Sequence, residues 1–135
     1  MNTSTDYAAL LLRVSLGVMF LAHSLILKVF TFGLAGTSQW FVSIGLPGWL
    51  AYAVCFAEII GGTMLILGVY TRWAALALLP ILLGAAFVHW SNGWVFSAPN
   101  GGWEYPVFLA LAIVVQSLLG NGAFSLQRAI ATRYT

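Results

Sequence analysis

Charged side chains are scarce in this sequence. Asp, Glu, Lys and Arg make up only 6% of its 135 residues, whereas they make up roughly 25% of an average soluble protein. Hydrophobic residues account for 61%. Five basic and three acidic side chains are too few to cover a soluble domain of this size with polar groups. The composition therefore predicts a protein that has the lipid bilayer as its solvent.

The sequence has little cysteine and no cluster of basic residues, and each of these features excludes a class of function. The single Cys55 excludes a disulfide within the chain and a metal cluster built on cysteine. The five Lys and Arg residues are spread along the sequence, which excludes a basic patch for nucleic acid. The sequence contains no haem attachment motif, phosphate loop or dinucleotide fingerprint. The chain is thus expected to encode no redox cofactor of its own.

Long apolar runs dominate what remains. Four of them cover residues 8–31, 48–70, 73–90 and 103–120. Each is close to the ~20 residues that cross a ~30 Å hydrocarbon core at ~1.5 Å per residue. A helix satisfies its own backbone hydrogen bonds in lipid. We therefore expect an all-α, polytopic membrane protein: one domain over residues 1–135, built as a bundle of four transmembrane helices.

The connections between the runs fit this bundle. Thr71 and Arg72 leave room only for a tight hairpin between the second and third runs. Between the first two runs, Trp40 and its apolar neighbours fall at helical spacing. Thr37 is a suitable N-cap and Gly45 a suitable stop. These features predict a short helix over 37–45 that lies in the membrane interface.

Basic residues predict the orientation of the bundle. With both termini in the cytoplasm, the inner side carries Arg13, Arg72, Arg128 and Arg133, and the outer side carries only Lys28. This asymmetry follows the positive-inside rule. We expect a multi-pass protein with both termini in the cytoplasm.

Glu58 is the acid that the bilayer makes most costly. It falls within ~2 Å of the middle of its run, and His23 falls ~5 Å to the outer side of the middle of the first run. An intramembrane charge costs ~2.5–3.5 kcal/mol, so such groups usually face the bundle and find partners. Depth alone makes His23 the best match for Glu58, although Lys28 and Arg13 could reach it with their long side chains. Glu58 is either a proton or ligand site, or a protonated acid bonded to a backbone carbonyl.

Other polar residues could support such a site. Ser24 shares a helical stripe with Arg13 and Lys28, whereas Gln116 is expected to form a hydrogen bond between helices near the phase of Tyr105. His89 and Glu104 border the outer interface. Each of these two also has a structural explanation: His89 stands next to Trp90 at an interface position, and Glu104 is an acid at the N-terminus of the fourth helix, where the helix dipole favours it. The two histidines and two acids lack the local spacing of a metal site, so no metal is predicted.

Small residues accompany Glu58 along its run. Gly61 and Gly62 are expected to let a neighbouring helix approach closely. Ala53, Ala57 and Gly61 form a small-xxx-small series on one helical face, which is typical of tightly packed transmembrane helices.

The order of these features resembles the DoxX family of small bacterial membrane proteins. The resemblance is carried by RVSLGVMFLAHSLILK at 13–28, by GLP and AEIIGG around the second run, and by GWEYP at the start of the fourth. Many members have the histidine and lysine of the first helix four residues apart. Here His23 and Lys28 are five apart, about 140° out of phase in a regular helix. A local π-bulge would restore a shared face.

The resemblance implies a four-helix protein of the bacterial cytoplasmic membrane with a link to quinone chemistry. His23 and Glu58 would then bind a quinone or similar small apolar ligand, and Lys28 would polarise its carbonyl oxygen. Protons would leave through His89 and Glu104, and a redox partner subunit or a bound substrate would supply electrons. Two alternatives remain open. One is a small-solute or proton transporter that acts as a homo-oligomer, and the other is an accessory subunit of a larger membrane complex.

Overall fold

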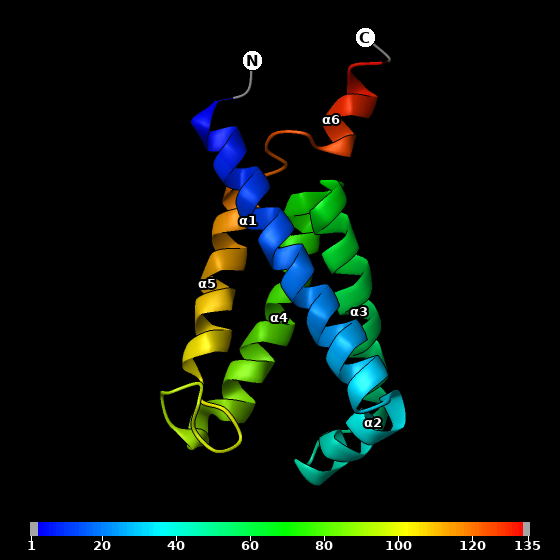
Figure 1. Cartoon of the computed structure of the whole chain (residues 1–135), viewed down its shortest axis with the longest axis vertical. Helices are drawn as coiled ribbons and strands as arrows, with labels where there is room; N and C mark the ends of the chain where they lie inside the picture. Colours follow the sequence, from blue (N-terminus) through cyan, green and yellow to red (C-terminus); the bar gives the residue numbers. More distant parts are fainter. Residues whose placement is uncertain (1–2, 134–135) are drawn as a thin grey trace.

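The computed structural model describes residues 3–133, and every regular element within that range is a helix (Figure 1). The all-α fold predicted from the apolar runs is therefore confirmed. In chain order the elements are α1 (Ser4–Leu21), η1 (Ala22–Thr31), α2 (Leu34–Ser43), α3 (Gly48–Leu67), α4 (Thr71–His89), η2 (Trp90–Asn92), α5 (Glu104–Leu119) and α6 (Leu126–Ala131).

Three helical stretches have the length and hydropathy of membrane-crossing helices: Ser4–Thr31, Gly48–Leu67 and Thr71–Asn92. The fourth apolar run forms α5, a shorter apolar helix of 16 residues. Large apolar side chains cover the outside of these helices, and Leu11, Phe87 and Leu118 are among the most exposed. Such an exterior suits contact with lipid tails.

The helices form a bundle with two different ends (Figure 1). The α1 helix contacts both α3 and α5, and α4 also packs against both. The start of α1 and the short α6 lie at one end. At the other end lie α2 and the loop that joins η2 to α5. A core of Leu16, Leu65, Leu78 and Ile113 fills the bundle.

Glycines allow the helices of this bundle to approach closely. A Cβ atom on Gly17 would lie 2.7 Å from the carbonyl oxygen of Gly62, and one on Gly61 would lie 2.8 Å from the Leu78 side chain. The expected role of Gly61 and Gly62 is thus confirmed. The small-residue series is buried only at Gly61, because Ala53 and Ala57 face outward.

The short helix after the first span begins earlier than predicted. The α2 helix starts at Leu34 because Gly33, with φ +73°, reverses the chain just before it. Thr37 is not the N-cap; it lies inside the helix, where its hydroxyl donates to the carbonyl oxygen of Gly33 at 2.9 Å. Gly45, with φ +83°, follows the end of α2, as the predicted stop requires.

The hairpin between the second and third spans also lies earlier than predicted. The α3 helix ends at Leu67, and Gly68 caps it in the left-handed conformation with φ +69°. Thr71 and Arg72 do not form the turn, because they already open α4.

Candidate functional site

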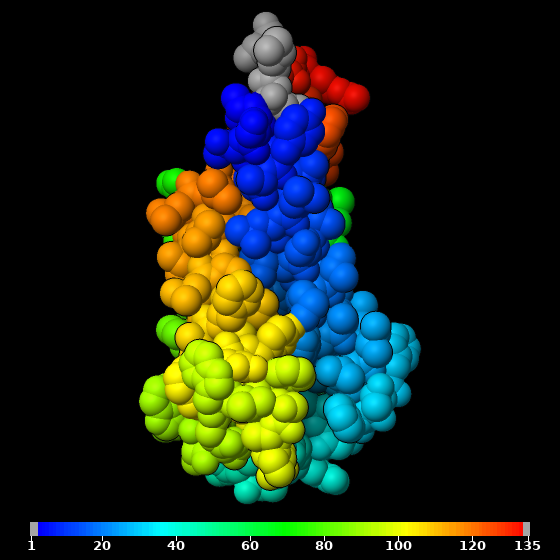
Figure 2. Space-filling view, turned by 60° about the vertical axis from the view of Figure 1, so that its left-hand side comes forward, coloured from blue at the N-terminus to red at the C-terminus, as the bar shows by residue number. Residues whose placement is uncertain are grey.

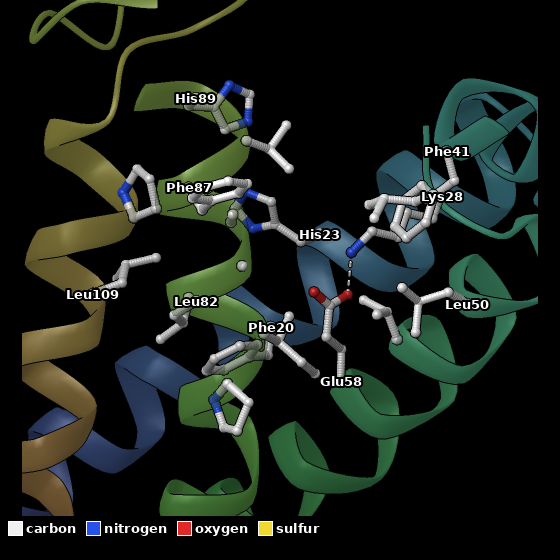
Figure 3. Close-up of a pocket in the computed structure, with 18 of the residues that line it drawn as sticks. Phe20, His23, Lys28, Phe41, Leu50, Glu58, Leu82, Phe87, His89 and Leu109 are labelled. Carbon is white, nitrogen blue, oxygen red and sulfur yellow. Dashed lines mark hydrogen bonds and ion pairs between the residues drawn. The ribbon is translucent and has the colours of Figure 1, made fainter. Parts of the chain in front are cut away.

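A cavity of about 540 Å³ lies between η1 and helices α2 to α5, at the end of the bundle where α2 is located (Figure 3). Its walls are mainly apolar and aromatic. The polar side chains on the wall are His23, Lys28, Glu58, His89 and Tyr105. An apolar cavity with a few converging polar groups is typical of sites for small organic ligands.

An ion pair lies on the cavity wall. Lys28 Nζ donates a hydrogen bond to Glu58 Oε2. The side chain of Glu58 is 6% exposed and that of Lys28 is 18% exposed, so water screens the pair poorly. Glu58 extends from the middle of α3 toward η1, as Figure 3 shows. The two charges therefore compensate each other inside the bundle.

The π-helix η1 explains how Lys28 reaches this position. In a π-helix the backbone bonds span five residues, and the amide of Phe32 accordingly donates to the carbonyl oxygen of Leu27 at 2.9 Å. Residues five apart are then neighbours along one face. His23 and Lys28 both line the cavity, so they share a face as the π geometry allows. The π geometry extends over a whole ten-residue helix and is not a single bulge.

His23 lines the cavity without bonding to Glu58. Its Nδ1 atom lies 2.9 Å from the carbonyl oxygen of Met19, and its ring stacks on Tyr105 with a centroid distance of 6.1 Å. The Tyr105 hydroxyl in turn lies 3.7 Å from Met19 Sδ. Depth alone favoured His23 as the partner of Glu58, whereas the structure pairs Glu58 with Lys28. The reason is that the π-helix turns the longer lysine side chain toward α3.

The two polar residues predicted at the outer interface are separated by the structure. His89 lines the cavity, and its Nδ1 lies 3.4 Å from Asn92 Nδ2. Glu104 does not line it. Its Oε1 atom instead accepts a hydrogen bond from the amide of Phe96 at 3.1 Å, because the loop before α5 folds back over the start of that helix. Glu104 is thus a loop contact, and it also stands at the first position of α5, where the structural explanation placed it.

Arg13 lies at the other end of the bundle, where it is 1% exposed. Its guanidinium group donates to the carbonyl oxygens of Leu65, Ile66, Asn121, Ala123 and Phe124. The idea that Arg13 could reach Glu58 is wrong, because carbonyl oxygens at the end of α3 and in the loop after α5 hold its side chain. Arg13 is therefore a structural group that ties α1 to α3 and to the chain after α5.

Ser24 and Gln116 also lie off the cavity wall. The hydroxyl of Ser24 donates to the carbonyl oxygen of Phe20 at 2.8 Å, within its own helical segment. Gln116 was expected to bond between helices, but its Nε2 donates at 2.8 Å to the carbonyl oxygen of Gly120, which caps the same helix. Both side chains are fully buried, and each donates to a backbone carbonyl oxygen four residues away.

Aromatic and apolar residues of the wall escaped sequence analysis. Trp40 and Phe41 come from α2, Phe87 comes from α4, and Leu109 comes from α5. The sequence does not distinguish an apolar side chain that faces a cavity from its apolar neighbours in the same run. Only the packing of the helices shows which side chains line the cavity. Across residues 3–133, no three His, Cys, Asp or Glu side chains come close enough together to hold a metal ion.

The fold and the cavity define a helical membrane protein with a buried ion pair on the wall of an apolar pocket. The DoxX family model matches residues 8–90, which is more than half of the chain, and the protein belongs to the DoxX family. It is thus an integral, multi-pass membrane protein. Four of the cavity's polar residues fall in the matched segment: His23, Lys28, Glu58 and His89.

The chain is also similar to a curated protein whose name refers to redox chemistry. The chain is 41% identical over 85 residues to a Bacillus subtilis (strain 168) protein named "Putative oxidoreductase CatD". The matched segment covers 63% of this chain and 61% of that relative's length. No solved structure matches the chain.

Proposed function

We propose that this protein is a quinone-linked redox component of the membrane, and that it holds a quinone or a similar small molecule in the cavity beside Lys28 and Glu58. One observation carries the proposal: a mainly apolar cavity has a charged pair and an imidazole on its wall. A quinone has the matching form, because its ring and tail are apolar and its two oxygens accept hydrogen bonds. The name of the Bacillus subtilis relative, "Putative oxidoreductase CatD", supports a redox role.

The electrons must come from outside this chain. The sequence encodes no motif for a bound redox cofactor, and a quinone cycles only when a second reactant gives or takes electrons. A redox partner subunit or a bound substrate would fill this role. In this scheme Lys28 polarises a quinone oxygen and His23 handles a proton at the ring.

The proposed membrane topology has four spans with both termini on the cytoplasmic side of the bacterial cytoplasmic membrane. The start of α1 and α6 lie at the same end of the bundle (Figure 1), which supports an even number of spans. Arg13, Arg72 and Arg128 lie toward this end, whereas Lys28 belongs to the other half. At ~1.5 Å per residue, the 16 residues of α5 cover ~24 Å, so α5 would cross with the help of its flanking residues.

Transport is the competing function, since a buried acid beside a basic group also suits a carrier. The close packing at the other end of the bundle disfavours a transport path through a single chain. There Gly17 and Gly62 bring α1 and α3 into contact, and the Arg13 side chain fills the space between α3 and the loop after α5.

A binding and turnover experiment tests the proposal. The purified protein in lipid nanodiscs is titrated with ubiquinone-1, and empty nanodiscs correct for partition into lipid. We expect saturable binding in the wild type, at least tenfold weaker binding in Glu58→Gln, and unchanged binding in Asp6→Asn. Asp6 forms the exposed ion pair with Arg128 at 2.8 Å, away from the cavity. Absence of saturable binding, together with absence of quinone-dependent turnover with candidate donors, would refute the proposal.

A further inference from the structure

The polar groups of the cavity offer more acceptors than a quinone can use. Glu58 receives one hydrogen bond, from Lys28 to Oε2. Within residues 3–133 its other oxygen, Oε1, has no hydrogen-bond donor. Lys28 carries three N–H groups and uses one of them on Glu58. This pair thus presents two remaining donors on Lys28 and a carboxylate acceptor on Glu58.

The hydrogen bond of His23 identifies its protonated nitrogen. Nδ1 lies 2.9 Å from the carbonyl oxygen of Met19, and a carbonyl oxygen can only accept, so Nδ1 carries the proton. In a neutral imidazole the other nitrogen, Nε2, is then an acceptor. In the described part of the chain, Nε2 has no donor of its own. His23 therefore adds a second acceptor to the cavity wall.

From this inventory we propose that the cavity binds the reduced, hydroxyl-bearing form of its ligand more tightly than the oxidised form, that is, a quinol more tightly than the matching quinone. The inference rests on the proposed function and adds the oxidation state that the site prefers. Both oxygens of a quinone only accept, so they can use a donor such as Lys28, which Glu58 holds at the wall, but they cannot use an acceptor. Glu58 Oε1 and His23 Nε2 would be left without partners.

A quinol satisfies all three groups. Each of its hydroxyls donates one hydrogen bond and can accept another. One hydroxyl donates to His23 Nε2, and the other donates to Glu58 Oε1 while it accepts from Lys28. A site built to pair with a hydroxyl discriminates against an analogue that lacks it, because its own buried polar groups then lose their partners.

The test compares one ring in two oxidation states. Durohydroquinone and duroquinone are measured separately by equilibrium dialysis against the protein in lipid nanodiscs, with empty nanodiscs as the blank and an anaerobic buffer for the reduced form. We expect the quinol to bind about tenfold tighter or more, the effect of one matched hydrogen bond. For this two-electron couple, a tenfold ratio raises the midpoint potential of the bound ligand by about 30 mV.

A His23→Phe variant isolates one acceptor. Phenylalanine keeps an aromatic ring beside Tyr105 but offers no nitrogen to a hydroxyl. We expect the variant to lose most of its preference for durohydroquinone over duroquinone. Asp6→Asn, at the opposite end of the bundle, is the matched control and should keep the full preference.

The outcomes separate the inference from the proposed function. Equal affinities, or tighter binding of duroquinone by the wild type, would overturn the inference and leave quinone binding intact. A preference that survives in His23→Phe would overturn the assignment of His23 Nε2 as an acceptor. If neither form binds saturably, the proposed function fails and the inference fails with it.

Discussion

The two ends of the bundle handle buried charge in different ways. At one end, Arg13 gives its guanidinium donors to five backbone carbonyl oxygens, and arginine has five N–H groups to give. At the other end, Lys28 and Glu58 make one hydrogen bond to each other and border a cavity of about 540 Å³. Figure 2 shows the full length of the molecule, with α2 and the loop before α5 gathered at the cavity end.

The difference teaches how to distinguish a structural charge from a site. Burial alone does not separate them, because Arg13 is 1% exposed and Glu58 is 5% exposed. The separating property is hydrogen-bond capacity that remains available. Arg13 has used all of its donors, so a ligand could gain nothing there. Lys28, Glu58 and His23 keep donors and acceptors beside an open volume.

The largest effect is expected at the packed end. Arg13→Met would leave five carbonyl oxygens without their donor and should lower the free energy of unfolding by on the order of 4 kcal/mol. Reversible unfolding in mixed detergent and SDS micelles measures the loss. Arg128→Met is the control, because Arg128 pairs with Asp6 at an exposed position, and its effect should be small. If the Arg13→Met protein is as stable as the wild type, Arg13 is not the structural group that distinguishes this end of the bundle from the cavity end.

The next effect separates stability from binding at the cavity end. Glu58→Gln leaves Lys28 without a counter-charge and should cost about 2–3 kcal/mol of unfolding free energy, because a half-broken buried pair is unfavourable. The double variant Lys28→Met/Glu58→Gln removes both charges and should recover most of that stability. Binding of ubiquinone-1 should be at least tenfold weaker in both variants.

The double variant gives the decisive measurement for this pair. If Lys28 and Glu58 only hold the helices together, ligand binding should survive wherever the fold survives. Recovery of stability without recovery of binding identifies the pair as a site. Binding that returns together with stability would place the Lys28–Glu58 pair in the same structural class as Arg13.

The glycine contact between the two ends is the third place to test. Gly17→Ala would put a methyl group 2.7 Å from the carbonyl oxygen of Gly62 and should cost about 2 kcal/mol as α1 and α3 move apart. Because Lys28 lies on the continuation of α1, ligand binding should also weaken. Gly36→Ala is the matched control: Gly36 lies in α2 with nothing within 4 Å of the added carbon. Equal stability of the two variants would contradict the close contact.

Part of this arrangement could be predicted from the sequence. Apolar runs located the main helices, because the bilayer leaves few alternatives to a helix. The rise per residue placed Glu58 near the middle of its span. In a regular helix, His23 and Lys28 would not share the face that the family resemblance implies; a π geometry would restore it, and η1 is a π-helix.

Other features could not be predicted, for physical reasons. The partners of Arg13 include backbone carbonyls more than a hundred residues away in sequence, and every residue has such a carbonyl. Depth alone could not choose between His23 and Lys28 as the partner of Glu58, because the choice depends on the direction in which η1 turns each side chain. The wall residue Phe41 cannot be told from a lipid-facing aromatic until the helices are packed, where it is buried.

Glu104 provides the smallest and sharpest test of the comparison, because it is an acid near the cavity end that does not line the cavity. Its carboxylate accepts from the amide of Phe96 at 3.1 Å, so Glu104→Ala should cost about 1 kcal/mol and speed hydrogen exchange at that amide. Glu104→Gln keeps an oxygen acceptor and should retain the protection. Ligand affinity should be unchanged in both variants, because Glu104 does not line the cavity. A loss of binding in Glu104→Ala as large as that in Glu58→Gln would show that an acid off the cavity wall also takes part in the site, and it would contradict the assignment of the site to the wall residues.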